Sequence, residues 1–139
     1  MGYEFQVVVD CSDPHTQADW WAEALGWEVE PQDEGFIRSM VEQGNATEEE
    51  TTTHRGKLVW KVGGAIRHPE RPRVLFQLVP EAKTVKNRVH LDIRVGEEKR
   101  AAEVERLIGL GAKVLHDGRQ GPFTWVTMAD PEGNEFCVA

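Results

Sequence analysis

The stretch Val89-His90-Leu91-Asp92-Ile93 decides the fold, because the chain carries its pattern twice. It precedes a helical stretch that ends at Leu110-Gly111-Ala112-Lys113-Val114. In the first half of the chain, Phe5-Gln6-Val7-Val8-Val9 likewise leads to Leu25-Gly26-Trp27-Glu28-Val29. Each copy is too short to be a domain of its own, so the two copies are predicted to pair into one structure with a ligand site between them.

Local patterns place strands and helices in the same order in both copies. Residues 4–10 alternate and are rich in valine, which indicates a strand. Asp13 is a suitable N-cap with Pro14 in the first helical position, and Gly26 can end that helix. A second helix is expected over 97–109, and further strands over 57–63, 73–79, 87–95, 113–116, 123–129 and 134–138. The sequence therefore predicts an α+β fold of two repeated βαβββ modules, whose curved mixed sheets surround a cavity.

The whole chain, residues 1–139, is expected to form a single domain. Module one covers about residues 3–80 and module two about residues 86–139, by the extent of the repeat. Residues 31–56 form an insertion in module one, and Glu34 to Gln43 within it have apolar residues at helical spacing. Packing against a sheet edge or a dimer partner is favoured for this insertion over a lid on the cavity.

The composition of the chain disfavours some classes of binding partner and indicates a cellular location. The chain has 16 basic and 24 acidic residues, a net charge of −8, which disfavours nucleic acid and anionic membranes as partners. It has no apolar run of about 18 residues and no signal-peptide pattern at Met1, so the cytoplasm is the expected location. Cys11 and Cys137 are too few for a disulfide scaffold, and a reduced pair suits that compartment.

Alternation along the strand around His90 puts Arg88, His90, Asp92 and Arg94 on one face. On the residues alone, this face is equally compatible with a cavity and with solvent. Between Arg67 and Arg94, seven basic residues accompany only three acidic ones. Arg88 could therefore bind a carboxylate or phosphate of a ligand, or simply be solvated.

Three stretches resemble the vicinal oxygen chelate superfamily, which includes glyoxalase I, bleomycin-resistance proteins and extradiol dioxygenases. They are residues 5–29, residues 73–95 with Lys-Asn-Arg-Val-His-Leu-Asp, and the ending Asp130-Pro131-Glu132-Gly133-Asn134. The last is similar to a D-P-[DE]-G-N run before the final strand in that superfamily. The resemblance implies that the inner face of the His90 strand lines a pocket, and that two copies of the chain form a homodimer.

In that superfamily, the first and last strands of each module commonly supply ligands to a divalent metal. The resemblance transfers these positions to Gln6, Gln77, His90 and Cys137, where the usual set is His or Gln, Glu, His and Glu. Both carboxylates are missing, so the site is expected to be degenerate, without bound Mg, Mn or Fe. No resident metal is expected, although zinc stays open because His90 and a Cys137 thiolate are good zinc ligands.

For Glu135, Asp92 and Trp125, the sequence allows both a functional and a purely structural interpretation. Glu135 lies on the same strand face as Cys137 and is either exposed or directed into the cavity. Asp92 could orient the His90 ring, act as a base, or form an ordinary ion pair. Trp125 is one of five tryptophans and could stack on an aromatic ligand, although most tryptophans in so short a chain belong to the core. The histidines other than His90 are expected at the surface, namely His15, His54, His68 and His116.

These observations predict a glyoxalase-like protein that binds a small organic molecule, and an anionic molecule is one of the options. The ligand-binding candidates are Gln6, Gln77, Arg88, His90, Trp125 and Cys137. The alternative is a lyase or isomerase of the glyoxalase type, with His90, Asp92 and Glu135 as catalytic candidates and zinc as an optional aid. A third reading is a structural or regulatory protein with a vestigial cavity, so whether the chain is an enzyme stays open.

Overall fold

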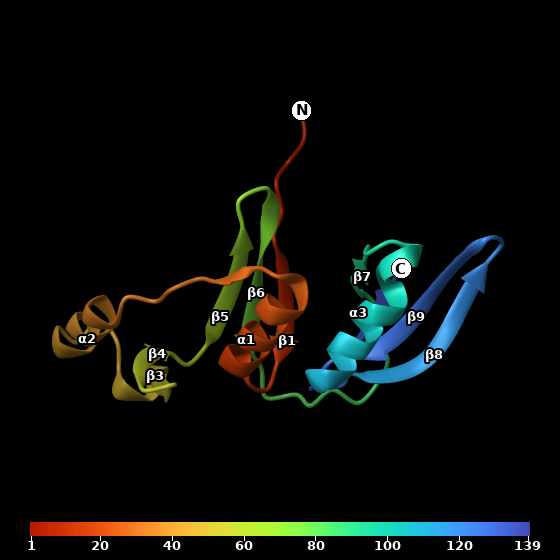
Figure 1. Ribbon diagram of the computed structural model, residues 1–139. Coiled ribbons are helices and arrows are strands. Elements are labelled where there is room, and N and C mark those ends of the chain that lie inside the picture. Colours follow the sequence, from red (N-terminus) through yellow and green to blue (C-terminus); the bar gives the residue numbers. More distant parts are fainter. The chain divides into compact units, whose positions relative to one another are not determined.

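The computed structural model describes residues 1–139 and divides the chain into two compact units, Met1–Ala82 and Lys83–Ala139 (Figure 1). Each unit contains the strand, helix and three further strands that the repeated pattern predicts. The predicted α+β fold with mixed sheets is therefore confirmed. The first unit carries its insertion between the second and third strands of this pattern.

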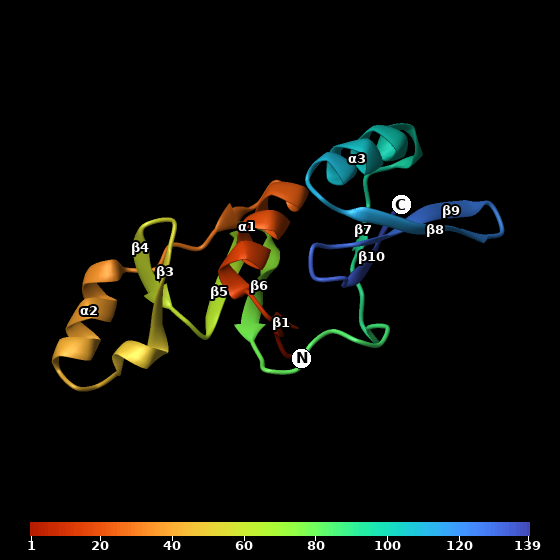
Figure 2. The same ribbon diagram turned by 90° about the horizontal axis from the view of Figure 1, so that it is seen from below.

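The first unit contains a four-stranded sheet in the order β1-β6-β5-β2. Its elements are β1 (Val7–Cys11), α1 (Pro14–Leu25), β2 (Glu28–Val29), β5 (Gly63–His68) and β6 (Arg71–Leu78). β1 pairs with β6 in parallel, and the other pairs are antiparallel. Helix α1 lies along β5 and β6 (Figure 2) and is capped as the sequence predicts, by Asp13 at its start and by Gly26 with φ 71° at its end.

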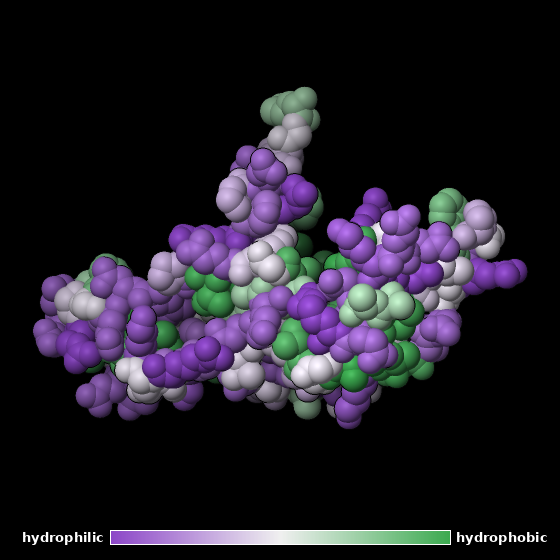
Figure 3. Space-filling model, in the orientation of Figure 1, coloured by the Kyte–Doolittle hydropathy of each residue, from purple (hydrophilic) through white to green (hydrophobic).

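The insertion forms a substructure of its own. It contains α2 (Glu34–Glu42), the 3-10 turn η1 (Glu48–Glu50) and a separate hairpin of β3 (Thr51–His54) and β4 (Lys57–Trp60), so it extends beyond residue 56, where the sequence predicted its end. Ile37 on α2 is fully buried, and Glu34 accepts a hydrogen bond of 3.1 Å from the backbone N–H of Leu58. Hydrophilic side chains dominate the visible surface around α2 (Figure 3), which agrees with this single buried position in the helix.

The helix predicted at 34–43 is confirmed, but the strand predicted at 57–63 is wrong in its extent, because β4 ends at Trp60 and a separate strand begins at Gly63. Residues 57–60 pair with β3, and the third strand of the module is β5. β5 begins with Gly63-Gly64-Ala65, which has no strand-like alternation in the sequence. A Cβ at Gly64 would lie 3.0 Å from His15 Nδ1, which is tighter than an ordinary van der Waals contact, so glycine suits the close packing of α1 on the sheet.

The second unit contains a four-stranded sheet in the order β7-β10-β9-β8. Its elements are β7 (Asp92–Ile93), α3 (Glu97–Gly109), β8 (Lys113–Gln120), β9 (Phe123–Ala129) and β10 (Glu135–Val138). α3 contacts β8 and β10, and its Leu107 is buried together with Met128, Phe136 and Val138 of the sheet. These side chains form the core of the unit on one face of the sheet.

Two strands of this unit, β7 and β8, differ from their predicted bounds by more than one residue. β7 has only two residues instead of the span 87–95, although the carbonyls of Leu91 and Ile93 still accept hydrogen bonds from β10 and Ala139. The preceding residues are held by contacts of Asn87 with the Asn134 and Glu135 side chains instead of a ladder, and Val89 is 78% exposed. β8 continues to Gln120 instead of ending at 116. None of the helices is both long and apolar enough to cross a membrane.

Candidate functional site

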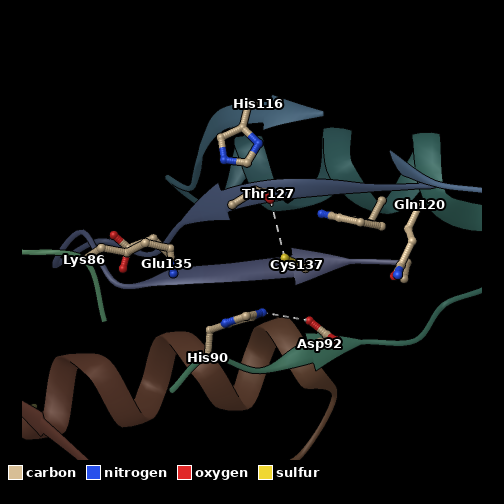
Figure 4. A pocket seen from close by; sticks show the side chains of 10 residues that line it. Lys86, His90, Asp92, His116, Gln120, Thr127, Glu135 and Cys137 are labelled. Atoms are coloured by element: carbon tan, nitrogen blue, oxygen red, sulfur yellow. Dashed lines mark hydrogen bonds and ion pairs between the residues drawn. The ribbon is translucent and has the colours of Figure 1, made fainter. Parts of the chain in front are cut away.

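A cavity of about 380 Å³ lies within the second unit, on the sheet face opposite the buried core (Figure 4). Strand alternation explains its wall, because Phe136 and Val138 point to the core while Glu135 and Cys137 point to the cavity. The lining residues are Lys86, His90, Asp92, His116, Gln120, Trp125, Thr127, Glu135, Cys137 and Ala139.

His90, Asp92 and Cys137 form the chemically richest part of this wall. His90 Nε2 lies 3.3 Å from Asp92 Oδ1, and Cys137 is the register partner of Asp92 across the β10–β7 pair. One donor atom from each of the three residues lies within 4.8 Å of the others. In Figure 4, His90 and Asp92 face each other beside the Cys137 sulfur, whose Sγ is 3.5 Å from Thr127 Oγ1.

This group combines an imidazole, a carboxylate and a thiol, which is a donor set that suits zinc when the thiol ionises. Two members, His90 and Cys137, are positions that the family resemblance indicated. Asp92 adds a carboxylate that the position-by-position comparison did not offer. Three protein donors beside an open cavity would leave a fourth coordination position for a small molecule.

Glu135 lies in the cavity wall, but both of its oxygens are engaged. Lys83 Nζ donates to Oε2 at 3.0 Å, and the Asn87 backbone N–H donates to Oε1 at 2.9 Å. Burial raises the pKa of this carboxyl, but the hydrogen bonds from Asn87 and Lys83 outweigh burial and lower the pKa to about 2. Glu135 is therefore ionised at neutral pH and anchors the segment that leads to His90.

The Asp130-Pro131-Glu132-Gly133-Asn134 run forms the turn that makes this anchoring possible. Asp130 Oδ1 accepts hydrogen bonds of 2.9 Å from the backbone N–H groups of Glu132 and Asn134, and Gly133 has φ 89°. The Asn134 side chain accepts a hydrogen bond of 2.8 Å from Asn87 Nδ2. The motif thus builds the cavity indirectly, by fixing Asn87 and the start of β10.

The predicted site residues are distributed over both units. The second-unit cavity brings together His90, Asp92, Trp125, Glu135 and Cys137. Arg88 is exposed and does not line it. Gln6 and Gln77 belong to the first unit, where Gln77 lies on β6 and Gln6 precedes β1.

The corresponding face of the first unit carries an ion pair. Arg73 donates two hydrogen bonds of 2.8 Å to the carboxylate of Glu30 and one of 3.2 Å to Gln6 Oε1. The hydrogen bond from Arg73 lowers the pKa of Glu30, and the same contact raises the pKa of Arg73. Gln6 is therefore committed to a side chain of its own unit.

Sequence reasoning missed five lining residues, Lys86, His116, Gln120, Thr127 and Ala139. His116 is exposed, as predicted, yet it also lines the cavity. The alternation of His116, Gly118 and Gln120 would have indicated their common face if the predicted strand had been extended beyond 116.

The prediction that His15 lies at the surface is wrong. Its ring on α1 is buried, and Nε2 lies 2.7 Å from the Trp60 carbonyl oxygen.

A family profile described as a glyoxalase-like domain matches residues 6–139. Among solved structures, fosfomycin resistance protein FosX from Mesorhizobium loti has a TM-score of 0.65 at 8% identity, covering 99% of this chain and 90% of that one. A mutant FosX from Listeria monocytogenes, complexed with Mn(II) and 1S,2S-dihydroxypropylphosphonic acid, has a TM-score of 0.66 at 8% identity and covers 99% and 89%.

A glyoxalase/bleomycin resistance protein/dioxygenase family enzyme from Burkholderia phytofirmans has a TM-score of 0.62 at 13% identity. The match covers 96% of this chain and 94% of that one. At these identities the structural likeness concerns the fold alone. No curated protein matches the sequence.

Proposed function

Because this chain belongs to the glyoxalase-like domain family of the vicinal oxygen chelate superfamily, we propose that it binds a small organic molecule in the cavity of its second unit. The observation that carries this proposal is the convergence of His90, Asp92, Trp125, Glu135 and Cys137 on one cavity. Its size, about 380 Å³, falls within the range of small-molecule pockets, roughly 300–1,000 Å³.

The wall offers distinct contacts to such a ligand. Trp125 supplies apolar area, and His90 and Thr127 supply hydrogen-bonding groups. Lys86 is the lysine of the wall, and its ammonium is the group that would meet an acidic function on the ligand. In this proposal Lys86 takes the role that the sequence analysis offered to Arg88, because Lys86 lines the cavity and Arg88 does not.

A second function is favoured by the donor group of His90, Asp92 and Cys137. We propose as this alternative a metal-assisted lyase or isomerase, in which these three residues hold zinc. A bound zinc ion would act as a Lewis acid toward a carbonyl oxygen of the substrate. Without metal, His90 would be the base that moves a proton, with Asp92 Oδ1 at 3.3 Å orienting the ring. Glu135, with its pKa near 2, would hold the segment before His90 in place.

Fluorescence or NMR titration with small aromatic carboxylates and phosphonates tests the binding proposal. Saturable binding by the wild-type protein should be weakened by Trp125→Leu and Lys86→Ala. Arg88→Ala is the matched control, because it removes a nearby exposed cation that does not line the cavity. Equal weakening by Arg88→Ala would indicate a site elsewhere, and the absence of binding across the panel would count against the proposal.

Elemental analysis of protein purified without chelator or affinity metal separates the two functions. Near-stoichiometric zinc that is lost in His90→Ala and in Asp92→Ala would put the metal-assisted reaction first. Protein that stays metal-free after incubation with zinc would exclude the proposed zinc ligands. The single-domain organisation, the homodimer and the cytoplasmic location expected from the sequence stay predictions.

A further inference from the structure

The Trp125 indole fills the space that a side chain at Gly118 would take on the paired strand. They are register partners, and a Cβ on Gly118 would lie 2.1 Å from both Cε2 and Nε1 of the indole. Such a distance is far inside van der Waals contact, where carbon atoms meet at about 3.5–4.0 Å. The indole therefore lies in the volume that any other residue at position 118 would fill.

The backbone does not require glycine at this position. Gly118 is not among the positive-φ glycines, whereas Gly121 in the following turn has φ 58° and open space around its Cα. Glycine in the interior of a strand is unfavourable by roughly 0.5–1 kcal/mol relative to alanine. The gain that offsets this cost at Gly118 is room for the Trp125 ring.

The surroundings direct the indole to the cavity. His116 and Gln120 lie two positions before and after Gly118 on the same face of β8, and both line the cavity together with Trp125. The ring thus closes the gap between them that a missing side chain would leave. Arg100 of α3 fixes the neighbouring residue of β9, donating hydrogen bonds of 2.9 Å and 2.6 Å to the carbonyl and hydroxyl oxygens of Thr124.

We propose that Gly118 is a positioning residue that holds the Trp125 indole as a flat part of the cavity wall, and that the ligand carries a planar aromatic ring which packs on it. This inference rests on the proposed binding function and specifies its ligand class. Figure 4 shows Gln120, next to Gly118 in the strand face, and Lys86 at opposite ends of the cavity. A planar ring at the tryptophan end leaves an acidic substituent free to reach toward Lys86.

The steric part of the proposal is tested by a double-mutant cycle. Gly118→Ala should lower the Tm of the wild-type protein by about 5 °C or more, because the ring has to move. In the Trp125→Leu background the same change should be neutral or raise the Tm. Gly109→Ala, which meets nothing within 4 Å and has no positive φ, is the matched control and should not lower the Tm in either background. A loss of Tm from Gly118→Ala that persists without the indole would overturn the steric assignment.

The ligand class is tested with a matched pair of probes, 2-naphthoate and its saturated analogue decahydro-2-naphthoate, titrated by NMR. The wild-type protein should bind the planar acid about tenfold or more tightly. Gly118→Ala and Trp125→Leu should both abolish this preference, while Gly109→Ala keeps it. Equal binding of the two acids to the wild-type protein would overturn the inference and leave small-molecule binding intact. Binding of neither acid, nor of any compound of the panel above, would overturn the proposed function and the inference together.

Discussion

The two units share one chain pattern but use their polar side chains differently. In the first unit, Gln6 accepts a hydrogen bond from Arg73, whose guanidinium is also bound by Glu30. In the second unit, His90, at the position equivalent to Gln6, contacts Asp92 at the edge of a cavity. The comparison teaches that the βαβββ unit supplies a scaffold, and that a few side chains decide which polar contacts its open face carries: an ion pair in the first unit, and a group of possible metal ligands beside a cavity in the second.

The units also differ in how far the ion pair beside the open face is exposed to solvent. The second unit relies on Glu135, which is 13% exposed and links Lys83 and Asn87 to β10. The first unit relies on the Arg73–Glu30 pair, whose side chains are 39% and 31% exposed. Because solvent screens the more exposed pair, the anchor of the second unit should stabilise its unit more strongly.

The largest effect is expected from removing this anchor. Glu135→Gln should lower the free energy of unfolding of the second unit by about 3 kcal/mol, because Lys83 loses its ionised partner in a largely buried setting. Native-state hydrogen exchange should show faster exchange in β9 and β10 and unchanged exchange in β1 and β6. Glu105→Gln on the exposed face of α3 is the control. Equal loss of protection in both units would mean that the anchor is not local to its unit.

Acid should weaken the second unit through the same carboxylate. The pKa of Glu135 is lowered from 4.5 to about 2, so its stabilising contribution is complete above pH 4.5 and is lost as the pH falls toward 2. Between pH 6 and pH 3 the loss should amount to about 2 kcal/mol for this group. Hydrogen exchange of β10 as a function of pH measures it, after correction for the intrinsic exchange rates. In Glu135→Gln, this part of the pH dependence should vanish.

The corresponding change in the first unit is expected to be smaller. Arg73→Met should cost about 1 kcal/mol, because the ion pair with Glu30 is partly solvated. The pKa of Glu30 is lowered by Arg73, so the contribution of the pair is present at neutral pH and is lost as the pH falls through the pKa of folded Glu30. Urea unfolding with Arg88→Met as the exposed control measures the difference. A cost equal to that of Glu135→Gln would contradict the ranking of the two units.

Sequence reasoning captured the elements whose signals are local. The caps at Asp13 and Gly26 correctly predicted the first helix. The Asp130 to Asn134 run, placed before the last strand by the family resemblance, forms a turn there. The adjacency of His90 and Asp92 followed from alternation, and the structure brings the two together. These features depend on neighbours in the chain, so a single sequence is sufficient to predict them.

The features that sequence reasoning missed depend on contacts between distant residues. β5 was missed because its two glycines suit close packing on residues distant in the chain: a Cβ at Gly63 would lie 2.9 Å from the Phe76 carbonyl oxygen, and one at Gly64 would lie 3.0 Å from His15 Nδ1. The shortness of β7 depends on Asn87 bonding to the Asn134 side chain and the Glu135 carboxylate. Gly118 gave no signal of its own, since its role depends on where the indole of Trp125 lies.

The smallest effect concerns the insertion, which distinguishes the first unit from the second. Asp19 on α1 accepts from His54 Nε2 at 2.6 Å and from Arg55 Nε at 3.1 Å, which ties the β3–β4 hairpin to the helix. Arg55 has φ 49° and precedes Gly56 with φ 78°, so this contact also supports a tight hairpin turn. His15 also contacts the hairpin. Its ring stacks on that of His54 with the ring centroids 5.3 Å apart, and its Nε2 lies 2.7 Å from the Trp60 carbonyl oxygen.

Asp19→Asn should therefore loosen the hairpin without unfolding the module. The amide can still accept a hydrogen bond but lacks the charge that attracts Arg55, so a loss of about 0.5–1 kcal/mol is expected in the hairpin alone. Hydrogen exchange should quicken in β3 and β4 and stay unchanged in β1, β6 and the whole second unit. Glu42→Gln on the exposed end of α2 is the control for a lost surface charge in the insertion. If β1 and β6 lost protection together with the hairpin, the insertion would be part of the cooperative core of the first unit, and the simpler βαβββ scaffold of the second unit would not be its structural equivalent.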